Sequence, residues 1–238
     1  MSNAVYTALS KQAGLMKEMN SIANNIANAS TAGYRRDSFV FSEYVQRLES
    51  QDQSLSQTNV AGRFFDATPG SLTRTGATFD VAIDGDGYFL VETPRGERLT
   101  RMGSFLVDAE GQLVTHDGNR VLGDGGSPVA IPAGANNITI APDGTIAADG
   151  APVGKIGVVT ASPTGLAREG NNLLRSDEDY QPVEFASVRQ GFIEESNVNA
   201  VIEVSRLIEV QRAYELNQQL MQDEDERIKK TVEAMRRR

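Results

Sequence analysis

Apolar residues recur at helical spacing near the start of the chain. A three-and-four spacing, with Gln12 as its one polar member, predicts an amphipathic helix whose stripe contains Val5, Ala8, Leu15, Met19, Ile22 and Ile26. The helix is expected to stop at Asn28, because turn-forming residues follow from Ala29 onward. Gly33, at the end of that turn, can take a left-handed conformation at little cost.

The last part of the chain repeats the pattern. Over about five heptads, the stripe contains Val204, Leu207, Tyr214, Met221, Ile228, Val232 and Met235. Gln211, Gln218 and Asp225 stand at every seventh position of this stripe, where polar residues weaken a dimeric coiled coil and help to fix its register. Ser196, Asn197 and Asn199 are candidate caps at the start of this helix.

Between the two helical patterns the sequence changes to short apolar runs separated by glycine-containing turns at roughly ten-residue intervals. Residues Phe79–Ile83 alternate apolar and polar positions, and Tyr88–Glu92 do so in part. Such a pattern is typical of antiparallel strands joined by tight turns. We therefore predict a central antiparallel all-β domain.

These patterns together predict an α+β fold. The terminal helices are expected to pair as a coiled-coil-like helical domain, with residues 1–30 and 191–238 as its two parts. Residues 31–75 are assigned to a connector of irregular or extended structure, and residues 76–190 to the β domain.

The composition excludes several kinds of site. There is no cysteine and no tryptophan, and His116 is the one histidine, so disulfides, thiolate metal sites and multi-histidine metal centres are excluded. The acidic excess behind the net charge of -9 lies entirely between the two predicted helices, and an acidic surface does not attract nucleic-acid phosphates. We expect no cofactor, no metal ion and no nucleic-acid partner.

No segment of the sequence reads as a membrane span or a secretory signal. A bilayer-crossing helix needs a run of about 18 apolar residues, and no such run is present. The N-terminus also lacks the charged start, apolar stretch and small-residue cleavage site of a cleavable signal peptide. We expect no direct insertion into a membrane.

The terminal helices carry more apolar surface than one partner helix covers. Ala4, Leu9, Ala13, Met16, Ala23 and Ala27 widen the apolar zone of the first helix beyond its stripe. Neighbouring copies of the chain would cover this surface, whereas in an ordinary α+β protein both helices would fold onto the β domain; periodicity alone leaves both open. For the polymer we predict a subunit interface formed by Val5, Leu15, Met19, Ile22, Ile26, Tyr34, Val204, Leu207, Gln211, Tyr214, Met221 and Ile228.

Three groups of segments favour the polymer. The first is Asn24–Arg36, and the second, in the middle of the chain, comprises Gly70–Leu72, Phe79–Ile83, Gly85–Phe89, Thr100–Arg101 and Gly103–Phe105. The third comprises Gly191–Glu194, Ser196–Asn199 and Gln211–Asn217. In this order and over nearly the whole chain, they resemble the rod and hook family of flagellar axial proteins. Residues Asp223–Arg238 are more polar than the usual end of that family.

The resemblance implies a mechanical function. It points to a structural subunit of the bacterial flagellar rod, because hook subunits carry an additional outer domain for which 238 residues leave no room. The opening segment Asn3–Ala8 is most similar to proximal rod subunits, with distal rod subunits as the alternative. In such a subunit the paired helices line the inner wall of a tube, the β domain forms its outer layer, and the polymer transmits torque around a central export channel.

The resemblance also implies partners and a location. The partners are copies of the chain itself, other proximal and distal rod subunits, and the flagellar type III export apparatus. The location is the periplasmic rod of the flagellar basal body, reached without a cleavable signal peptide.

Few residues are arranged for chemistry. Gly85-Asp86-Gly87 lies between two predicted strands and does not open a helix, which favours a hairpin turn over a phosphate-binding loop. Asp84 and Asp86 are similar to the start of a calcium loop, but Phe89 and Arg95 occupy the positions of its glycine and glutamate. His116 precedes Asp117-Gly118 in a predicted exposed turn. We therefore expect no enzymatic activity; an alternative from another class is a secreted glycan-binding β domain on a helical oligomerisation stalk.

Overall fold

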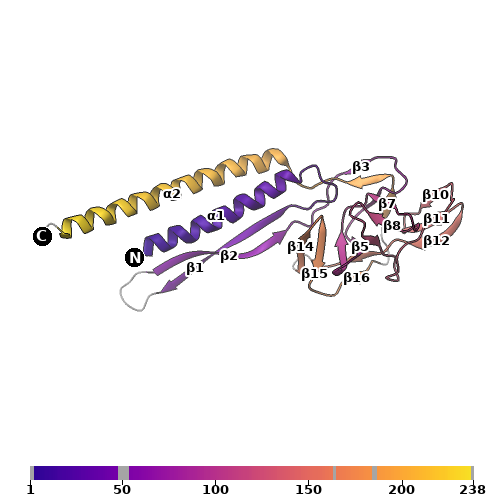
Figure 1. Ribbon diagram of the computed structural model, residues 1–238, viewed down its shortest axis with the longest axis horizontal. Helices are drawn as coiled ribbons and strands as arrows, with labels where there is room; N and C mark the ends of the chain where they lie inside the picture. Colours follow the sequence, from indigo (N-terminus) through magenta and orange to yellow (C-terminus); the bar gives the residue numbers. More distant parts are fainter. Residues whose placement is uncertain (1–2, 48–53, 163–164, 184–186, 237–238) are drawn as a thin grey trace. The chain divides into compact units, whose positions relative to one another are not determined.

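The computed structural model of the chain describes residues 3–47, 54–162, 165–183 and 187–236 (Figure 1). Side chains are described from Thr7 to Phe39 and, within those ranges, from Phe65 onward. The chain forms two compact units. The helical unit comprises Met1–Ala27, Asp37–Phe64 and Asn199–Arg238, and the β unit comprises Asn28–Arg36 and Phe65–Val198. The predicted α+β class is confirmed.

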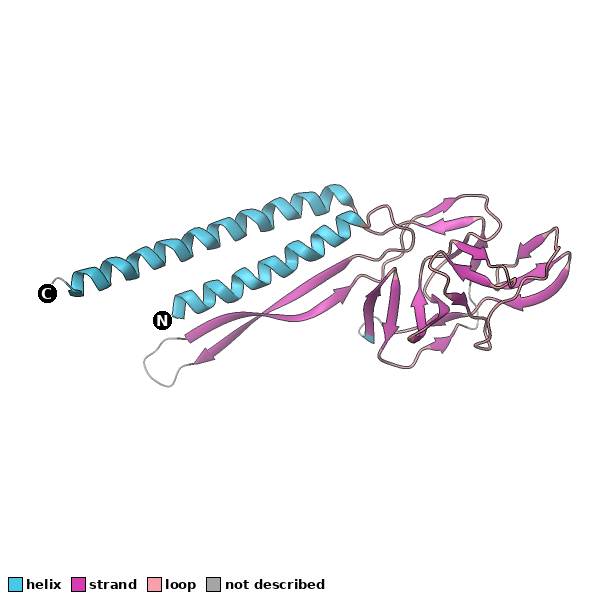
Figure 2. Cartoon of the chain, in the orientation of Figure 1, coloured by secondary structure: helices cyan, strands magenta, loops and turns pink. Residues whose placement is uncertain are grey.

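The helical unit contains two long helices and one two-stranded sheet. Helix α1 spans Asn3–Ala27 and helix α2 spans Ala200–Arg236. They lie side by side, and β1 (Asp37–Arg47) runs beside α1 and pairs with β2 (Ser54–Phe65) (Figure 2). In the part of the chain that the structure describes, neither helix is long and apolar enough to cross a bilayer.

The segment assigned to a connector therefore contains regular structure. β-branched and aromatic residues predominate between Phe39 and Val45 of β1, and such residues favour a strand. Sequence reasoning missed this pair of strands because its apolar positions do not alternate strictly.

The β unit is built from antiparallel pairs. The path of its largest sheet is β14 (Leu166–Gly170), β15 (Leu173–Ser176), β6 (Gly96–Thr100), β5 (Tyr88–Thr93), β9 (Arg120–Val121), β8 (Leu113–Thr115) and β7 (Phe105–Val107). Off this path, β13 (Val158–Thr160) pairs with β5 and with β16 (Gln181–Pro182). The central antiparallel β region is confirmed.

Smaller sheets complete the β unit. One consists of β10 (Ile138–Ile140), β11 (Thr145–Ala148) and β12 (Ala151–Lys155). Two are pairs: β4 (Val81–Ile83) with β17 (Val188–Gln190), and β3 (Leu72–Arg74) with β18 (Phe192–Glu194). The last two pairs join strands far apart in the sequence, so they close the β unit.

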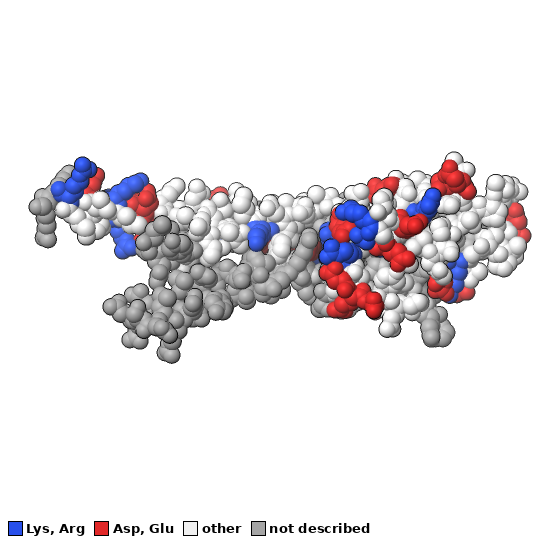
Figure 3. All heavy atoms as spheres, turned by 60° about the horizontal axis from the view of Figure 1, so that its bottom comes forward, with Lys and Arg blue, Asp and Glu red and all other residues white. Residues whose placement is uncertain are grey.

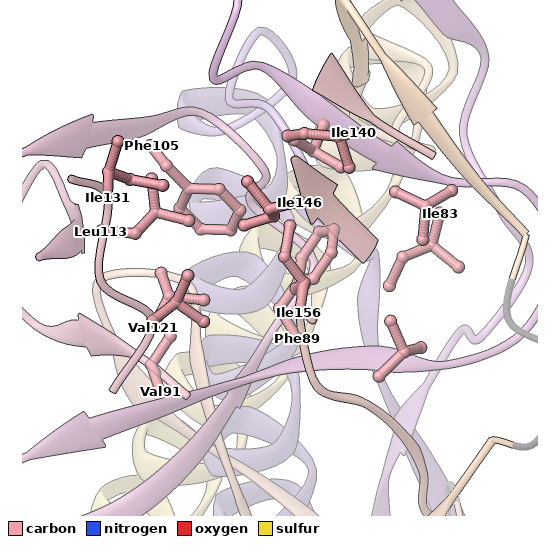
Figure 4. Close-up of a cluster of buried hydrophobic side chains, with 14 of the residues drawn as sticks. Ile83, Phe89, Val91, Phe105, Leu113, Val121, Ile131, Ile140, Ile146 and Ile156 are labelled. Atoms are coloured by element: carbon pink, nitrogen blue, oxygen red, sulfur yellow. The ribbon is translucent and has the colours of Figure 1, made fainter. Parts of the chain in front are cut away.

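The core of the β unit is apolar and closed. Side chains from several strands converge on Phe89 and Phe105, whose rings meet edge to face with centroids 5.2 Å apart (Figure 4). Val91, Leu113 and Val121 are fully buried around them. Burying one such side chain contributes about 1.5–3 kcal/mol, so this unit has the means to hold itself together.

The expected hairpin at Gly85-Asp86-Gly87 is wrong. β4 pairs with β17, whereas β5 pairs with β6, β9 and β13, so this turn connects two different sheets. The φ angle of Gly87 is +135°, and a Cβ there would meet Val158 at 2.8 Å. Glycine suits this position because of its positive φ angle and because the Val158 side chain leaves no room for a Cβ.

Candidate assembly interface

The two helices of the helical unit run in opposite directions. The Asn217 side chain donates a hydrogen bond to the carbonyl oxygen of Ala8 (2.9 Å), while Asn25, near the other end of α1, donates to Glu203 (3.2 Å). Among the described side chains of this pair, the buried apolar ones are those of Ala8, Ile22 and Val210. Among the described residues, few large apolar side chains are thus fully buried between the helices.

Polar residues fill much of the seam. Asn25 Nδ2 donates to the carbonyl oxygen of Asp37 (2.8 Å), and the Asp37 backbone N–H donates back to Asn25 Oδ1 (3.1 Å). Ser21 Oγ donates to the same carbonyl (2.9 Å), which ties β1 to α1. A search for apolar residues cannot find these polar positions. Two neighbouring asparagines within a predicted helix could have indicated them, because asparagine has a low helix propensity and is often kept there for a specific hydrogen bond.

Glu203 is the buried charge of this seam. Arg206 Nη1 lies 3.8 Å from Glu203 Oε1, and Arg206 Nη2 lies 3.7 Å from Glu18 Oε1. Burial raises the pKa of the Glu18 carboxyl above its ordinary value. Arg206 therefore bridges acidic side chains of both helices, and the pairing depends on complementary polar groups as well as on packing.

The stripe of α2 faces α1 in a register that differs partly from the predicted one. Leu207, Tyr214 and Met221 are half-buried, as their positions in the stripe suggest. The other buried positions are Glu203, Val210 and Asn217, each one residue before Val204, Gln211 and Gln218. The shift arises because Glu203 and Asn217 have hydrogen-bond partners in α1, which a search for apolar residues cannot detect.

The predicted interface residues whose side chains the structure describes fall into three groups. Ile22 is buried within the helical unit and Tyr34 within the β unit. Half-buried side chains are those of Leu15, Met19, Ile26, Leu207, Tyr214 and Met221, whereas Val204, Gln211 and Ile228 are exposed. The Val5 side chain lies outside the described residues. As contacts between subunits, all of them remain predictions.

Large apolar side chains are exposed on both helices. Among the described side chains of α1 they are Leu9 and Met16, and on the first six turns of α2 they are Val201, Ile202, Val204, Ile208, Leu216 and Leu220. Leu216 is 68% exposed and Val201 77%. Covering each such side chain would contribute about 1.5–3 kcal/mol, so these faces are candidates for contact with other chains.

A buried cluster in the β unit fixes the segments that lead to the helices. Arg35 Nη2 lies 2.6 Å from Glu194 Oε1, and Arg101 Nη1 lies 3.2 Å from Glu194 Oε2. The backbone N–H of Gly70 donates to Glu194 Oε1 (3.0 Å), and that of Gly33 donates to the Glu194 carbonyl oxygen (2.7 Å). The segment after α1 and the segment before α2 are thereby tied together.

The two arginines of this cluster have further acceptors. Arg35 also donates to the carbonyl oxygen of Thr68, and Arg101 to that of Gly85. Burial lowers the pKa of the Arg101 guanidinium, an effect that the neighbouring Glu194 carboxylate opposes. Two arginines that share one buried carboxylate depend on that carboxylate for their burial.

Tyr34 and the candidate caps take up defined places. The Arg168 guanidinium lies over the Tyr34 ring at 4.1 Å from its centroid and donates to the carbonyl oxygen of Arg35 (2.6 Å). Asn199 Oδ1 accepts from the backbone N–H groups of Val201 and Ile202, so its capping role is confirmed.

Asn197 does not cap α2. Its side chain instead accepts from the Arg36 N–H (2.6 Å) and donates to the carbonyl oxygens of Asp66 and Thr68. It therefore joins three segments of the β unit, a role that a local capping pattern does not reveal.

The residues weighed for chemistry lie apart. His116 is exposed in a turn, 3.2 Å from Ser104 Oγ, and Asp84 pairs with Arg189 at 2.5 Å. Among the described residues, no group of three or more His, Cys, Asp or Glu side chains has the arrangement of a metal site.

Three family models match separate segments of the chain. They are the flagella basal body rod protein (residues 6–35), the flagellar hook protein FlgE/F/G D1 domain (82–148) and the flagellar basal body rod FlgEFG protein C-terminal region (189–234). The matched segments include most of the motif segments recognised in the sequence.

Whole-length relatives agree with these matches. The flagellar basal-body rod protein FlgF of Caulobacter vibrioides is 39% identical over 99% of this chain and 98% of its own length. FlgF of Rhizobium meliloti is 36% identical over the same shares of the two chains. The flagellar basal-body rod protein FlgG of Bacillus subtilis is 30% identical over 99% of this chain and 100% of its own length.

Proposed function

The chain belongs to the family of flagellar basal-body rod proteins and is a structural subunit of the proximal rod, and we propose that its terminal helices build the polymer. The resemblance seen in the sequence is confirmed, as is the expectation that the chain is not an enzyme. Neither the distal-rod alternative nor the glycan-binding alternative is favoured by the relatives.

One observation carries the proposal: many large apolar side chains lie exposed along α1 and α2, whereas the β unit buries most of its own in a closed core and exposes only Leu106 and Val107 among the described residues. A rod subunit gains most by covering these faces with helices of neighbouring subunits. The contacts are heterologous, because one face meets a different face of the next subunit, and heterologous contacts generate an open helical polymer.

We assign a role to each part on this basis. Helices α1 and α2 pair in a coiled-coil-like manner along the inner wall, and the β unit forms the outer layer, with residues 31–75 as the link. Among the predicted interface residues, Val204, Gln211 and Ile228 contact neighbouring subunits, while Ile22, Leu207 and Tyr214 hold the helix pair that presents them. The polymer transmits torque around a central channel.

The partners follow from this role. Copies of this chain and other rod subunits meet the helical faces, and the flagellar type III apparatus exports the chain before it folds. Within the β unit, the Arg35–Glu194 ion pair joins the segment that follows α1 to the segment that precedes α2.

The test replaces two exposed leucines of α2 with aspartate, in the variant Leu216→Asp/Leu220→Asp. Both side chains are more than half exposed, so the free chain should keep its helicity and its stability within about 0.5 kcal/mol. When this variant is expressed in a strain that lacks the gene, we expect no rod assembly. Swimming should not be restored, and electron micrographs should show truncated basal bodies.

The matched control is Gln219→Asp/Gln222→Asp, which adds the same charge to the same part of α2 at exposed polar positions. This variant should assemble and swim. Swimming by the leucine variant would overturn the proposal that this helical face holds the subunits together.

A further inference from the structure

The last turns of α2 extend beyond the cover that α1 gives. Because Asn217 contacts Ala8 and the helices are antiparallel, the described start of α1 at Asn3 lies near residue 222 of α2. Every described residue from Asp225 to Arg236 is exposed. Figures 1 and 2 show this end of α2 projecting past α1.

This projecting segment, residues 223–236, carries an apolar face. Ile228, Val232 and Met235 follow one another at helical spacing, and Met235 is 73% exposed. They continue the stripe of Leu207, Tyr214 and Met221, which faces α1 further back. The segment is thus built to pack against a helix at a place where α1 is no longer present.

The charges of the projecting segment are separated into two blocks. Asp223–Glu226 form an acidic turn, and Arg227, Lys229 and Lys230 form the basic turn that follows. Within the helix they pair as Arg227 with Glu224 (2.7 Å), Lys229 with Asp225 (2.5 Å) and Lys230 with Glu226 (3.6 Å). Figure 3 shows charged side chains of both signs gathered at this end of α2.

An acidic turn followed directly by a basic turn can pair with a second copy of the same segment. The two copies must be displaced by four residues, so that the acidic turn of one lies beside the basic turn of the other. A second α2 that runs parallel and is shifted by about 6 Å places its acidic turn beside the basic turn of the first. Apolar positions flanked by charges of this kind set the partner and the register of paired helices. The pattern repeats from copy to copy, since the first segment still offers its acidic turn and the second still offers its basic turn.

We propose that residues 223–236 of α2 are a docking surface for the same segment of a second copy of this chain, displaced by one helical turn. Apolar contact by Ile228, Val232 and Met235 supplies the attraction, and the alternating turns fix the displacement. The proposal rests on the proposed function, because a polymer with all subunits in one orientation keeps neighbouring α2 helices parallel. An antiparallel pair would instead close into a dimer.

The test uses two charge-reversal variants of the whole chain. The all-basic variant carries Asp223→Lys, Glu224→Lys, Asp225→Lys and Glu226→Lys; the all-acidic variant carries Arg227→Glu, Lys229→Glu and Lys230→Glu. Lysine and glutamate are both good helix formers, so the helix itself is retained. Each variant alone puts like charges in contact between copies, and we expect neither to restore swimming to a strain that lacks the gene.

Co-expression of the two variants is the decisive arm. In alternation, each basic turn meets an acidic turn of the neighbouring copy, so we expect swimming to return. The ion pairs within each helix remain broken in both chains. If these charged residues acted only within their own helix, mixing the two variants would therefore not restore swimming. Swimming by either variant alone, or no rescue by the mixture, would overturn the proposal. Failure of the unaltered chain in the same strain would instead count against the proposed function.

Discussion

The β unit and the helical unit differ in how much of their apolar surface is buried within the free chain. In the β unit, Phe89, Val91 and Ile146 lie at the centre of a closed core and are almost fully buried. In the helical unit, the seam holds Asn25, Glu203 and Asn217, while large apolar side chains such as those of Ile208 and Leu216 lie exposed outside it. The β unit makes its apolar contacts within the chain, whereas many apolar side chains of the helical unit are left exposed and can be buried only by another chain.

This difference shows how a chain can fold and still be ready to polymerise. Polar residues in the seam orient α1 and α2 through specific hydrogen bonds, and they contribute less stability than leucines would at the same positions. The apolar surface left outside makes assembly favourable. Hence substitutions of apolar residues in the β unit should lower the stability of the free chain. Stabilisation of the helical unit should come mostly from contacts that form on assembly.

The largest expected effect is the loss of the buried carboxylate of the β unit. Glu194→Gln keeps the size of the side chain but leaves Arg35 and Arg101 buried without their shared counter-charge. Removing one partner of a buried ion pair costs about 3–5 kcal/mol. Urea unfolding of the purified chain should show this loss as a lower midpoint.

An exposed carboxylate of the same unit serves as the control. Glu92 lies 3.7 Å from Arg120 with both side chains about half exposed, so Glu92→Gln should change the stability by less than about 1 kcal/mol. Equal effects of the two substitutions would mean that the Glu194 cluster does not anchor the β unit.

Sequence patterns predicted the parts of the fold that obey a simple period. The helices α1 and α2 were expected from apolar spacing, and their boundaries at Ala27 and Ala200 agree with the turn and cap signals of Asn28 and Asn199. The exposed position of His116 also agrees with its predicted turn. In each case, neighbouring residues along the chain determine the outcome.

The features that were missed depend on partners distant in sequence. β4 pairs with β17 across more than a hundred residues, so the turn at Gly85 is no hairpin. Glu203 and Asn217 occupy the seam because Asn25 donates a hydrogen bond to Glu203 and the Ala8 carbonyl oxygen accepts one from Asn217. The Arg35–Glu194–Arg101 cluster combines three separate motifs, each of which was recognised by resemblance without any sign that its charges meet.

The next effect tests whether the polar seam orients the helices. Asn217→Ala removes the hydrogen bond to the Ala8 carbonyl oxygen and leaves a small gap at a buried position. The expected cost is about 1–3 kcal/mol, concentrated in the helical unit. Amide hydrogen exchange should show faster exchange in α2 around this position and unchanged protection in the β unit. Gln218→Ala, at the adjacent exposed position, should leave hydrogen exchange in α2 and in the β unit unaltered. Faster exchange in α2 of this variant would mean that Asn217 does not mark the buried face of the helix.

The smallest effect compares isoleucines of the two units. Ile208 of α2 is about half exposed, and alanine is the better helix former, so Ile208→Ala should change the stability of the free chain by no more than about 0.5 kcal/mol. The same substitution at the buried Ile146 of β11 should cost about 2–5 kcal/mol. Thermal unfolding of both variants, followed by circular dichroism, gives the comparison directly. A large loss at Ile208 would mean that this face of α2 is already covered in the free chain, and the difference between a closed unit and an open one would then disappear.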